Sequence, residues 1–465
     1  MYKTLAKTVF CGALVAAASL GQERVPPPPG EAVTLEEAAA FAAKNYPAIR
    51  ASLADVAAAG GGIDLARTAY LPRADLLLGF NRATRNNVFG LILPNGVIPA
   101  ISGPVQDEST YTSTFGSAAG ALLSWEPLDF GLRKANVQLA EAMKDRARAR
   151  QAVTEYQVSL AVVDAYLSAV ANQQAVAAAK ATVERMRVFS DSVAVLVKNE
   201  LRPGADHSRA RAELARDQTE LIRAEEQAEA ARATLAEWMG RAGETVEVRA
   251  AGLAGEPPAK AAGSNSVEVH PLAQAQEAEI AVAEAKRRTL DKEWRPKLAV
   301  QSALYGRGTG ASLDGTFGGG AHGLAPSEAN WAVGFNISLN ILDYKQNRVR
   351  RRIETHRKES EEANKDRVVQ ELKGQVARAR IAIDAARRVA QNTPIELDAA
   401  STLETQAQAR YRAGLGTVVE VAEAQGLLRQ AEVGNALARL GVWRALFSLA
   451  AAQGEMEELL TLSSR

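Results

Sequence analysis

The stretch that decides the fold is Trp331-Ala332-Val333-Gly334-Phe335-Asn336-Ile337-Ser338-Leu339-Asn340-Ile341. Successive side chains of a strand point to opposite faces, so one face here is large and apolar and the other is small or polar. The run has the length of a tilted strand that crosses a bilayer, about 9 to 11 residues. A soluble sandwich is the alternative, but it needs many more strands than this chain offers. We expect these side chains to face lipid: Trp331, Val333, Phe335, Ile337, Leu339 and Ile341.

Three further stretches have the character of strands, which makes four in all. A turn-rich segment separates the members of each pair, and the second such segment contains Gly318-Gly319-Gly320. It lacks the Lys-Ser/Thr of a P-loop and precedes a strand, so it is no phosphate site. Four strands cannot close a barrel, because about eight are needed and an open edge in lipid leaves backbone groups unpaired. The chain must therefore oligomerise to span a membrane. The three stretches are 73–80, 115–126 and 297–305.

Helices are expected on both sides of each strand pair. Short helices should cover 47–71 and 271–295, each ended by a proline that cannot continue it. Beyond Asp129 and Asp343 an apolar repeat of seven residues predicts a left-handed supercoiled helix of about 100 Å. An ordinary coiled-coil hairpin is the alternative for this part alone. In the first long helix the repeat consists of Leu132, Leu139, Val153, Leu160, Leu167, Val188 and Val195.

The whole plan occurs twice in the chain. Five landmarks of the first copy are 25, 57, 77 and 34 residues apart, and those of the second are 25, 47, 77 and 34 apart. Equal intervals indicate two halves that lie side by side over the same span. The 25- and 34-residue segments, placed end to end, nearly match the long helix between them. The landmarks are Pro47, Pro72, Asp129, Asp206 and Gly240, then Pro271, Pro296, Asp343, Glu420 and Gly454.

The N-terminus predicts export. Lys3 and Lys7 precede an apolar run, and Ser19-Leu20-Gly21 suits a signal peptidase, so residues 1–21 are interpreted as a signal peptide and 22–34 as a Pro-rich leader. The only cysteine, Cys11, lies in the signal peptide, so neither disulfides nor thiolate metal sites are expected in the mature chain. No later stretch has the roughly 18 uncharged residues of a membrane helix.

Composition argues against several classes of function. With 55 basic and 54 acidic residues the chain is nearly neutral, so no nucleic-acid partner is expected. The four histidines are scattered, and no nucleophile or metal-ligand spacing is present, so we expect no enzyme activity, no metal site and no cofactor. The histidines are His207, His270, His322 and His356.

Three motifs carry a family resemblance. Asn45-Tyr46-Pro47 opens the first short helix, and Pro127-Leu128-Asp129-Phe130-Gly131 follows the second strand. Tyr411-Arg412-Ala413-Gly414-Leu415-Gly416-Thr417-Val418-Val419-Glu420-Val421 marks the second helical reversal. Their order and doubled spacing over about residues 33–458 resemble the TolC family of outer-membrane efflux proteins.

The resemblance implies an α+β membrane protein that is mostly α, with two tandem repeats. Its homotrimer would form a 12-stranded β-barrel, four strands per chain, continuous with a long α-helical coiled-coil barrel. It would lie in the lipid of the cell outer membrane and extend into the periplasm as a passive exit duct for efflux or type I secretion. Its expected partners are a periplasmic adaptor (membrane fusion) protein and an inner-membrane transporter of the RND, ABC or MFS type.

The same resemblance assigns roles to residues at the helical tips. Acidic residues past the reversal would ring a periplasmic aperture, where close carboxylates favour cations. The alternative is that these are solvated acids at helix starts, stabilised by the helix dipole. The expected aperture residues are Asp206, Tyr411, Glu420 and Glu423. The expected adaptor-docking tips are Asn199, Glu200 and Leu201, and Ala413, Gly414 and Leu415.

Two departures from the family pattern concern these tips. Gly416 stands where the family often has an arginine that, with a tyrosine such as Tyr411, ties neighbouring helices. The first tip reads Asn199-Glu200-Leu201 in place of a Val-Gly-Leu type. Gly60-Gly61-Gly62 also interrupts the first short helix, although glycine costs about 1 kcal/mol in a helix.

The expected organisation follows from these observations. The main alternative function is a soluble periplasmic coiled-coil adaptor or tether, which would leave the alternating strands unexplained. The sequence does not identify the transported substrate. The expected segments after the leader are a first repeat at 35–240, an equatorial linker at 241–267, a second repeat at 268–458 and a tail at 459–465.

Overall fold

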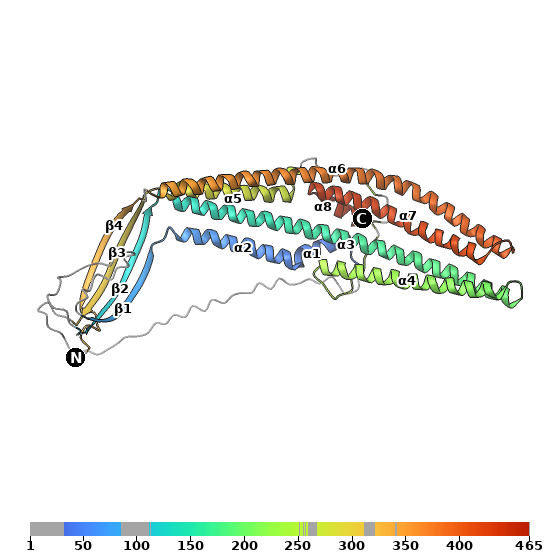
Figure 1. The fold of residues 1–465 in the computed structure, drawn as a ribbon, viewed down its shortest axis with the longest axis horizontal. Coiled ribbons are helices and arrows are strands. Elements are labelled where there is room, and N and C mark those ends of the chain that lie inside the picture. Colours follow the sequence, from blue (N-terminus) through green and yellow to red (C-terminus); the bar gives the residue numbers. More distant parts are fainter. Residues whose placement is uncertain are drawn as a thin grey trace.

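The chain is elongated, with a sheet at one end and two helical reversals at the other (Figure 1). The expected signal peptide, nearly all of the leader, and Ile341 lie outside the described residues. The computed structural model describes residues 32–84, 111, 113–250, 252–253, 255, 257–258, 267–310, 321–339 and 342–464.

The four strands form one antiparallel sheet in the order β1-β2-β3-β4. Sequence reasoning expected a two-stranded hairpin in each repeat, and β1–β2 and β3–β4 are these hairpins. The pairing of β2 with β3, which was not expected, joins them. Paired residues of an antiparallel sheet share a face, so Leu76, Ala121, Leu304 and Trp331 form one row across all four strands. The strands are β1 (Arg73–Thr84), β2 (Ser113–Leu128), β3 (Lys297–Thr309) and β4 (Glu328–Ser338).

The expected span of the deciding strand was wrong at both ends. β4 begins at Glu328 and ends at Ser338, so Leu339 lies beyond it. Its last partner is Lys297, the first residue of β3. Pro296 precedes that residue and has no N–H to donate to a ladder, so the pairing stops there.

Long helices make up most of the chain. α3 and α6 are each about 100 Å long at 1.5 Å per residue. Sequence reasoning did not separate α1 and α8 as elements; a capping box between Thr34 and Glu37 starts α1. The helices are α1 (Leu35–Asn45), α2 (Pro47–Thr68), α3 (Leu132–Lys198), α4 (Gly204–Trp238), η1 (Val267–Val269), α5 (Pro271–Glu293), α6 (Asp343–Arg412), α7 (Val418–Gln453) and α8 (Glu457–Ser464).

In each repeat a glycine lies where the short helix (α2 or α5) meets the end of the helix that returns from the tip (α4 or α7). Gly240 and Gly454 follow α4 and α7 with φ of +76° and +78°, a left-handed conformation that favours glycine. A Cβ at Gly240 would lie 3.2 Å from the Asn45 carbonyl oxygen, and one at Gly454 would lie 3.2 Å from the Pro271 ring. These contacts give the expected end-to-end stacking of short and returning helices.

The helices run side by side and together form an elongated shaft. Next to the sheet, α2 contacts α3, α3 contacts α5 and α5 contacts α6, while α4 and α7 run with the outer halves of α3 and α6 (Figure 1). A seven-residue spacing holds in α3: the expected residue Leu167 is buried, whereas the expected residues Val188 and Val195 are exposed. Its buried positions are Val158, Ala165, Ala179, Met186 and Val193.

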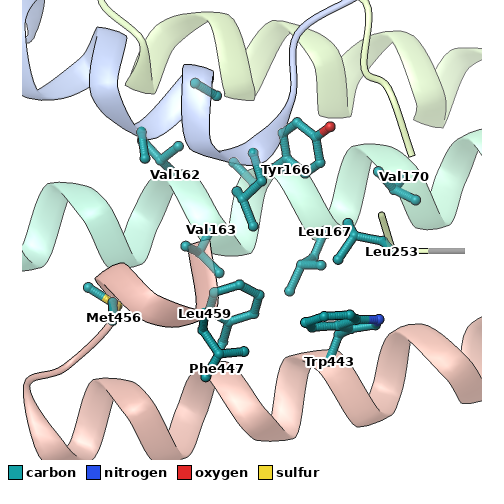
Figure 2. Packing of buried hydrophobic residues seen from close by; sticks show 14 of the residues in the cluster. Val162, Val163, Tyr166, Leu167, Val170, Leu253, Trp443, Phe447, Met456 and Leu459 are labelled. Atoms are coloured by element: carbon teal, nitrogen blue, oxygen red, sulfur yellow. The ribbon is translucent and has the colours of Figure 1, made fainter. Parts of the chain in front are cut away.

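The largest apolar core lies at the middle of the helical part, where α1, α8 and the ends of α4 and α7 meet α3 and α6. Figure 2 shows part of its packing. Tyr166 of α3 is fully buried, and its hydroxyl donates towards the carbonyls of Val33 (2.9 Å) and Arg249 (2.7 Å). Val33 also pairs with Val248 in a parallel bridge. The core thus fixes the segment before α1 and part of the linker against the shaft. It includes Val162, Leu167, Leu253, Trp443, Phe447 and Leu459.

Candidate functional site

The two helical reversals lie at the end of the shaft opposite the sheet (Figure 1). Each presents an exposed leucine, with 69% of Leu201 and 71% of Leu415 accessible. The other expected docking residues are also exposed: Asn199, Glu200, Ala413 and Gly414. An apolar side chain held in solvent at a turn is available to a partner, because none of the described residues covers it.

The first reversal is a fixed turn between α3 and α4. Glu200 adopts a φ of +60°, which reverses the backbone after α3. The Asn199 side-chain amide donates to the Val195 carbonyl at 2.9 Å, and the Leu201 N–H donates to the Leu196 carbonyl at 2.9 Å. These bonds satisfy carbonyls that the end of a helix leaves unpaired.

The second reversal is capped at both ends. Gly414 adopts a φ of +83° after α6, and its N–H donates to the Tyr411 carbonyl at 3.1 Å. Thr417 is the N-cap of α7 and accepts a hydrogen bond from the Glu420 N–H at 3.3 Å. Glu420 therefore lies in the first turn of α7, where the helix dipole stabilises a carboxylate.

Tyr411 is the centre of the contacts between the two reversals. Only 1% of this residue is exposed, and its ring meets that of Phe189 of α3 edge-on at 5.1 Å. The surrounding apolar cluster draws on all four helices of the tip. It comprises Met186, Phe189, Val193, Ala210, Ala407, Tyr411, Val418, Val421 and Ala424.

The structure brings Asp206 and Tyr411 together across the two repeats. The Tyr411 hydroxyl donates to Asp206 Oδ2 at 3.2 Å. Burial raises the pKa of Tyr411 to about 12, and the neighbouring Asp206 carboxylate acts in the same direction while Arg202 opposes it. The phenol is therefore neutral at physiological pH and is a stable donor to the carboxylate.

The other two expected aperture residues lie at the surface of the protomer. Glu420 Oε2 is 4.0 Å from Arg410 Nε, at the limit of an ion pair, and both side chains are largely exposed. Glu423 is exposed. An exposed pair of this kind contributes little to stability. Their carboxylates are free to interact with ions or with another copy of the chain.

One tip residue was missed by sequence reasoning. Arg202 follows Leu201 in the first reversal, and its guanidinium lies over the Tyr411 ring, 4.4 Å from the ring centroid. It also donates to the Tyr411 carbonyl. The sequence indicated only that Arg202 lies next to Leu201, an expected docking residue. It did not indicate a contact with Tyr411, which is 209 positions away in the chain.

The sheet end carries the expected apolar face. Of the expected lipid-facing residues, Trp331, Val333, Phe335 and Ile337 are in β4, and Leu339 follows it; all are exposed. Leu76, Leu78 and Phe80 of β1 and Leu304 of β3 extend this face, because their positions share its register. Every one of these residues except Leu339 has at least 65% of its surface accessible.

In the described part of the chain, no helix combines the length and the apolar character that crossing a bilayer requires.

Comparisons with known proteins agree with this architecture. A profile of the outer membrane efflux protein family matches residues 40–241 and 264–455, one segment for each repeat. No curated protein matches the chain.

Three solved channel proteins share the fold at low identity. The chain is similar to the outer-membrane channel OprN (19% identity, TM-score 0.68, covering 90% of this chain and 89% of that one). It is also similar to the CmeC outer membrane channel of Campylobacter jejuni (15%, 0.71, 93% and 89%). The values for CusC, which forms a transmembrane channel, are 14%, 0.72, 91% and 92%.

The family match covers most of the chain and includes both repeats. A soluble adaptor or tether is not favoured by it, and the family is one of efflux ducts rather than enzymes. The chain belongs to the outer membrane efflux protein family and serves as an exit duct of the outer membrane.

Proposed function

We propose that three copies of this chain assemble into one channel, with a 12-stranded barrel in the outer membrane and a helical tunnel in the periplasm. The single observation that carries this proposal is the open sheet. β1 and β4 are its edges, and each has pairing groups with no strand beside it among the described residues. Backbone groups unpaired in lipid are costly, so β1 of one copy would pair with β4 of the next.

Apolar helix surfaces support the same assembly. α2 and α6 are the outermost helices of the four next to the sheet. Leu65 of α2 has 72% of its surface accessible, and Ile381 and Ile395 of α6 have 70% and 68%. Contacts between copies along the shaft would bury side chains such as these, at about 25 cal/mol per Å² of apolar area.

The tips support docking and gating roles in this channel. Leu201 and Leu415 would contact a periplasmic adaptor, which would connect the duct to an inner-membrane transporter. Threefold symmetry would bring copies of Glu420 and Glu423 together around the aperture and make it selective for cations. We also propose that residues 1–21 are removed as a signal peptide. The mature chain would then consist of the leader, the first repeat, the equatorial linker, the second repeat and the tail, with the bounds given from the sequence.

Planar-bilayer recording of the purified protein tests the channel and its aperture together. The wild type should form cation-selective channels, and the double variant Glu420→Ala/Glu423→Ala should have a larger conductance and a weaker cation preference. A charge-matched control is Glu396→Ala/Asp398→Ala, whose exposed carboxylates lie on α6 about four turns from the tip. Unchanged conductance and selectivity in the Glu420/Glu423 variant would remove the aperture role.

Adaptor docking can be tested by single-cysteine crosslinking, because the only cysteine of the sequence lies in the expected signal peptide. Leu201→Cys or Leu415→Cys should crosslink in cells to a periplasmic adaptor. Ile222→Cys, an exposed apolar site on α4 away from the turn, is the control. Equal crosslinking at all three sites would argue against docking at the tips.

A further inference from the structure

Arg202 makes two different contacts with one buried residue of the other repeat. Its guanidinium lies 4.4 Å from the centroid of the Tyr411 ring, and it donates a hydrogen bond to the Tyr411 carbonyl. The Tyr411 hydroxyl in turn donates to Asp206, four residues after Arg202 in the chain. Arg202 of the first reversal therefore holds the carbonyl and ring of Tyr411, and Asp206 in the first turn of α4 holds its hydroxyl.

The first reversal fixes the position of Arg202. Glu200 has a φ of +60°, and Pro203, the N-cap of α4, has a φ of −65° set by its ring. Arg202 lies between these two constrained residues. Its side chain is therefore directed by the turn itself, which reduces the entropy lost when the guanidinium binds Tyr411.

The end of α6 is a favourable place for a cation. Tyr411 is the penultimate residue of α6, so its carbonyl has no partner within the helix; it accepts from the Gly414 N–H at 3.1 Å and from Arg202. The last carbonyls of a helix carry the negative end of its dipole, and a cation there is stabilised. A guanidinium also binds an aromatic face, and this interaction strengthens when the pair is shielded from water.

The other arginines near this helix end are directed elsewhere. Arg410 donates to the Leu415 carbonyl at 3.1 Å, and Arg412 lies 3.4 Å from the Gln408 side-chain oxygen. Position 416 leaves little room for a side chain, because a Cβ there would be 3.1 Å from the Tyr411 nitrogen and 3.2 Å from Glu420 Oε2. Among the described residues, Arg202 is thus the cation that contacts Tyr411.

We propose that Arg202 is a positioning residue that clasps the second reversal to the first and holds the tip of the duct in its narrow arrangement. The clasp consists of Arg202, Tyr411 and Asp206. Its effect on conduction rests on the proposed channel function, whereas its effect on the tip itself does not. Opening would require the guanidinium to leave both the ring and the carbonyl of Tyr411.

Hydrogen exchange of the purified protein in detergent tests the clasp without any channel measurement. Arg202→Ala should speed amide exchange in the second reversal, residues 411–417, by about tenfold, the factor expected when one charge-assisted contact is lost. Arg202→Lys keeps the charge and one donor and should restore much of the protection. Arg209→Ala removes an exposed arginine from the next turn of α4 and should have no effect. Unchanged exchange in Arg202→Ala would overturn the clasp.

A cycle with Tyr411 separates a specific contact from general weakening of the tip. Tyr411→Leu removes the ring and the hydroxyl but keeps the carbonyl that Arg202 also contacts, so Arg202→Ala should speed exchange less in the Tyr411→Leu background than in the wild type. Fully additive effects of the two substitutions would show that the ring contact contributes nothing and would overturn the clasp.

Planar-bilayer conductance of the same variants then tests the link to function. Arg202→Ala should raise the open fraction, Arg202→Lys should raise it less, and Arg209→Ala should match the wild type. If the wild type conducts and Arg202→Ala does not differ from it, the clasp does not hold the narrow state. If the wild type forms no channel, the proposed function fails, and hydrogen exchange still decides whether the clasp exists.

Discussion

At the residue scale, His270 shows how one buried polar side chain fixes a helix start. It is fully buried; its Nδ1 accepts from the Leu272 N–H at 3.1 Å and its Nε2 lies 3.0 Å from the Ala451 carbonyl. A carbonyl can only accept, so Nε2 carries the proton and Nδ1 does not. The neutral ring thereby caps α5 and ties it to α7.

This geometry predicts a dependence of stability on pH. Burial lowers the pKa of His270 below its usual 6.5, although the Ala451 carbonyl acts in the opposite direction. A lowered pKa means that the unfolded chain binds the proton more readily, so this contribution is complete above about pH 6.5 and is lost as the pH falls through the lower folded pKa.

The change that tests this dependence is His270→Gln, which keeps an acceptor and a donor but does not titrate. Between about pH 6.5 and 5 the Tm of the wild type should fall more steeply than that of His270→Gln, as measured by circular dichroism at each pH. His207→Gln makes the same substitution at the start of α4 and serves as the control, which should keep the wild-type slope. Equal slopes for the wild type and His270→Gln would contradict the prediction.

At the scale of elements, the sheet depends on close contact between strands. A Cβ at Gly120 of β2 would lie 2.5 Å from the Tyr305 Cβ and 2.9 Å from the Leu304 carbonyl oxygen. A Cβ at Gly334 of β4 would meet nothing within 4 Å. The two strand glycines thus differ in whether any side chain can be accommodated.

Gly120→Ala should therefore weaken the sheet, by about 1–3 kcal/mol for a side chain forced into a packed site. The expected result is a lower temperature for the heat-induced mobility shift in gel electrophoresis. Gly334→Ala, with open space around the new methyl group, should behave as the wild type. A similar loss in both variants would mean that glycine flexibility, rather than the contact with Tyr305, is what the sheet requires.

The glycines of α2 remain without a structural explanation. Gly60, Gly61 and Gly62 lie within a continuous helix; in the part of the chain that the structure describes, only the Lys144 side chain comes within 4 Å of a Cβ built on any of them. No contact among these residues explains why glycine rather than alanine occupies the three positions.

At the scale of the whole molecule, exposed apolar surface on α6 should determine assembly. Ile381→Glu/Ile395→Glu places two charges on a surface that the proposed trimer would bury, and an unpaired buried charge is strongly unfavourable. In mild detergent this variant should run as a monomer by native mass spectrometry, whereas the wild type should run as a trimer. A trimeric Ile381/Ile395 variant would exclude this surface from the interface.

The sequence determined the elements and their doubling. Spacing predicted the end-to-end helices, because the chain must return over the same span, and Gly240 and Gly454 occupy matching left-handed positions. Period-two alternation predicted the strand that contains Phe335, although the ends of that strand depend on where its partner β3 begins.

Tertiary structure alone decided which distant residues meet. The pairing of β2 with β3, the phase of the buried stripe on α3 and the contact of Arg202 with Tyr411 each join segments far apart in the chain. Periodicity reports which side of an element is apolar, but it does not report the rotation of that element against its neighbours. That rotation is set by packing of the whole shaft, so it became visible only in the folded chain.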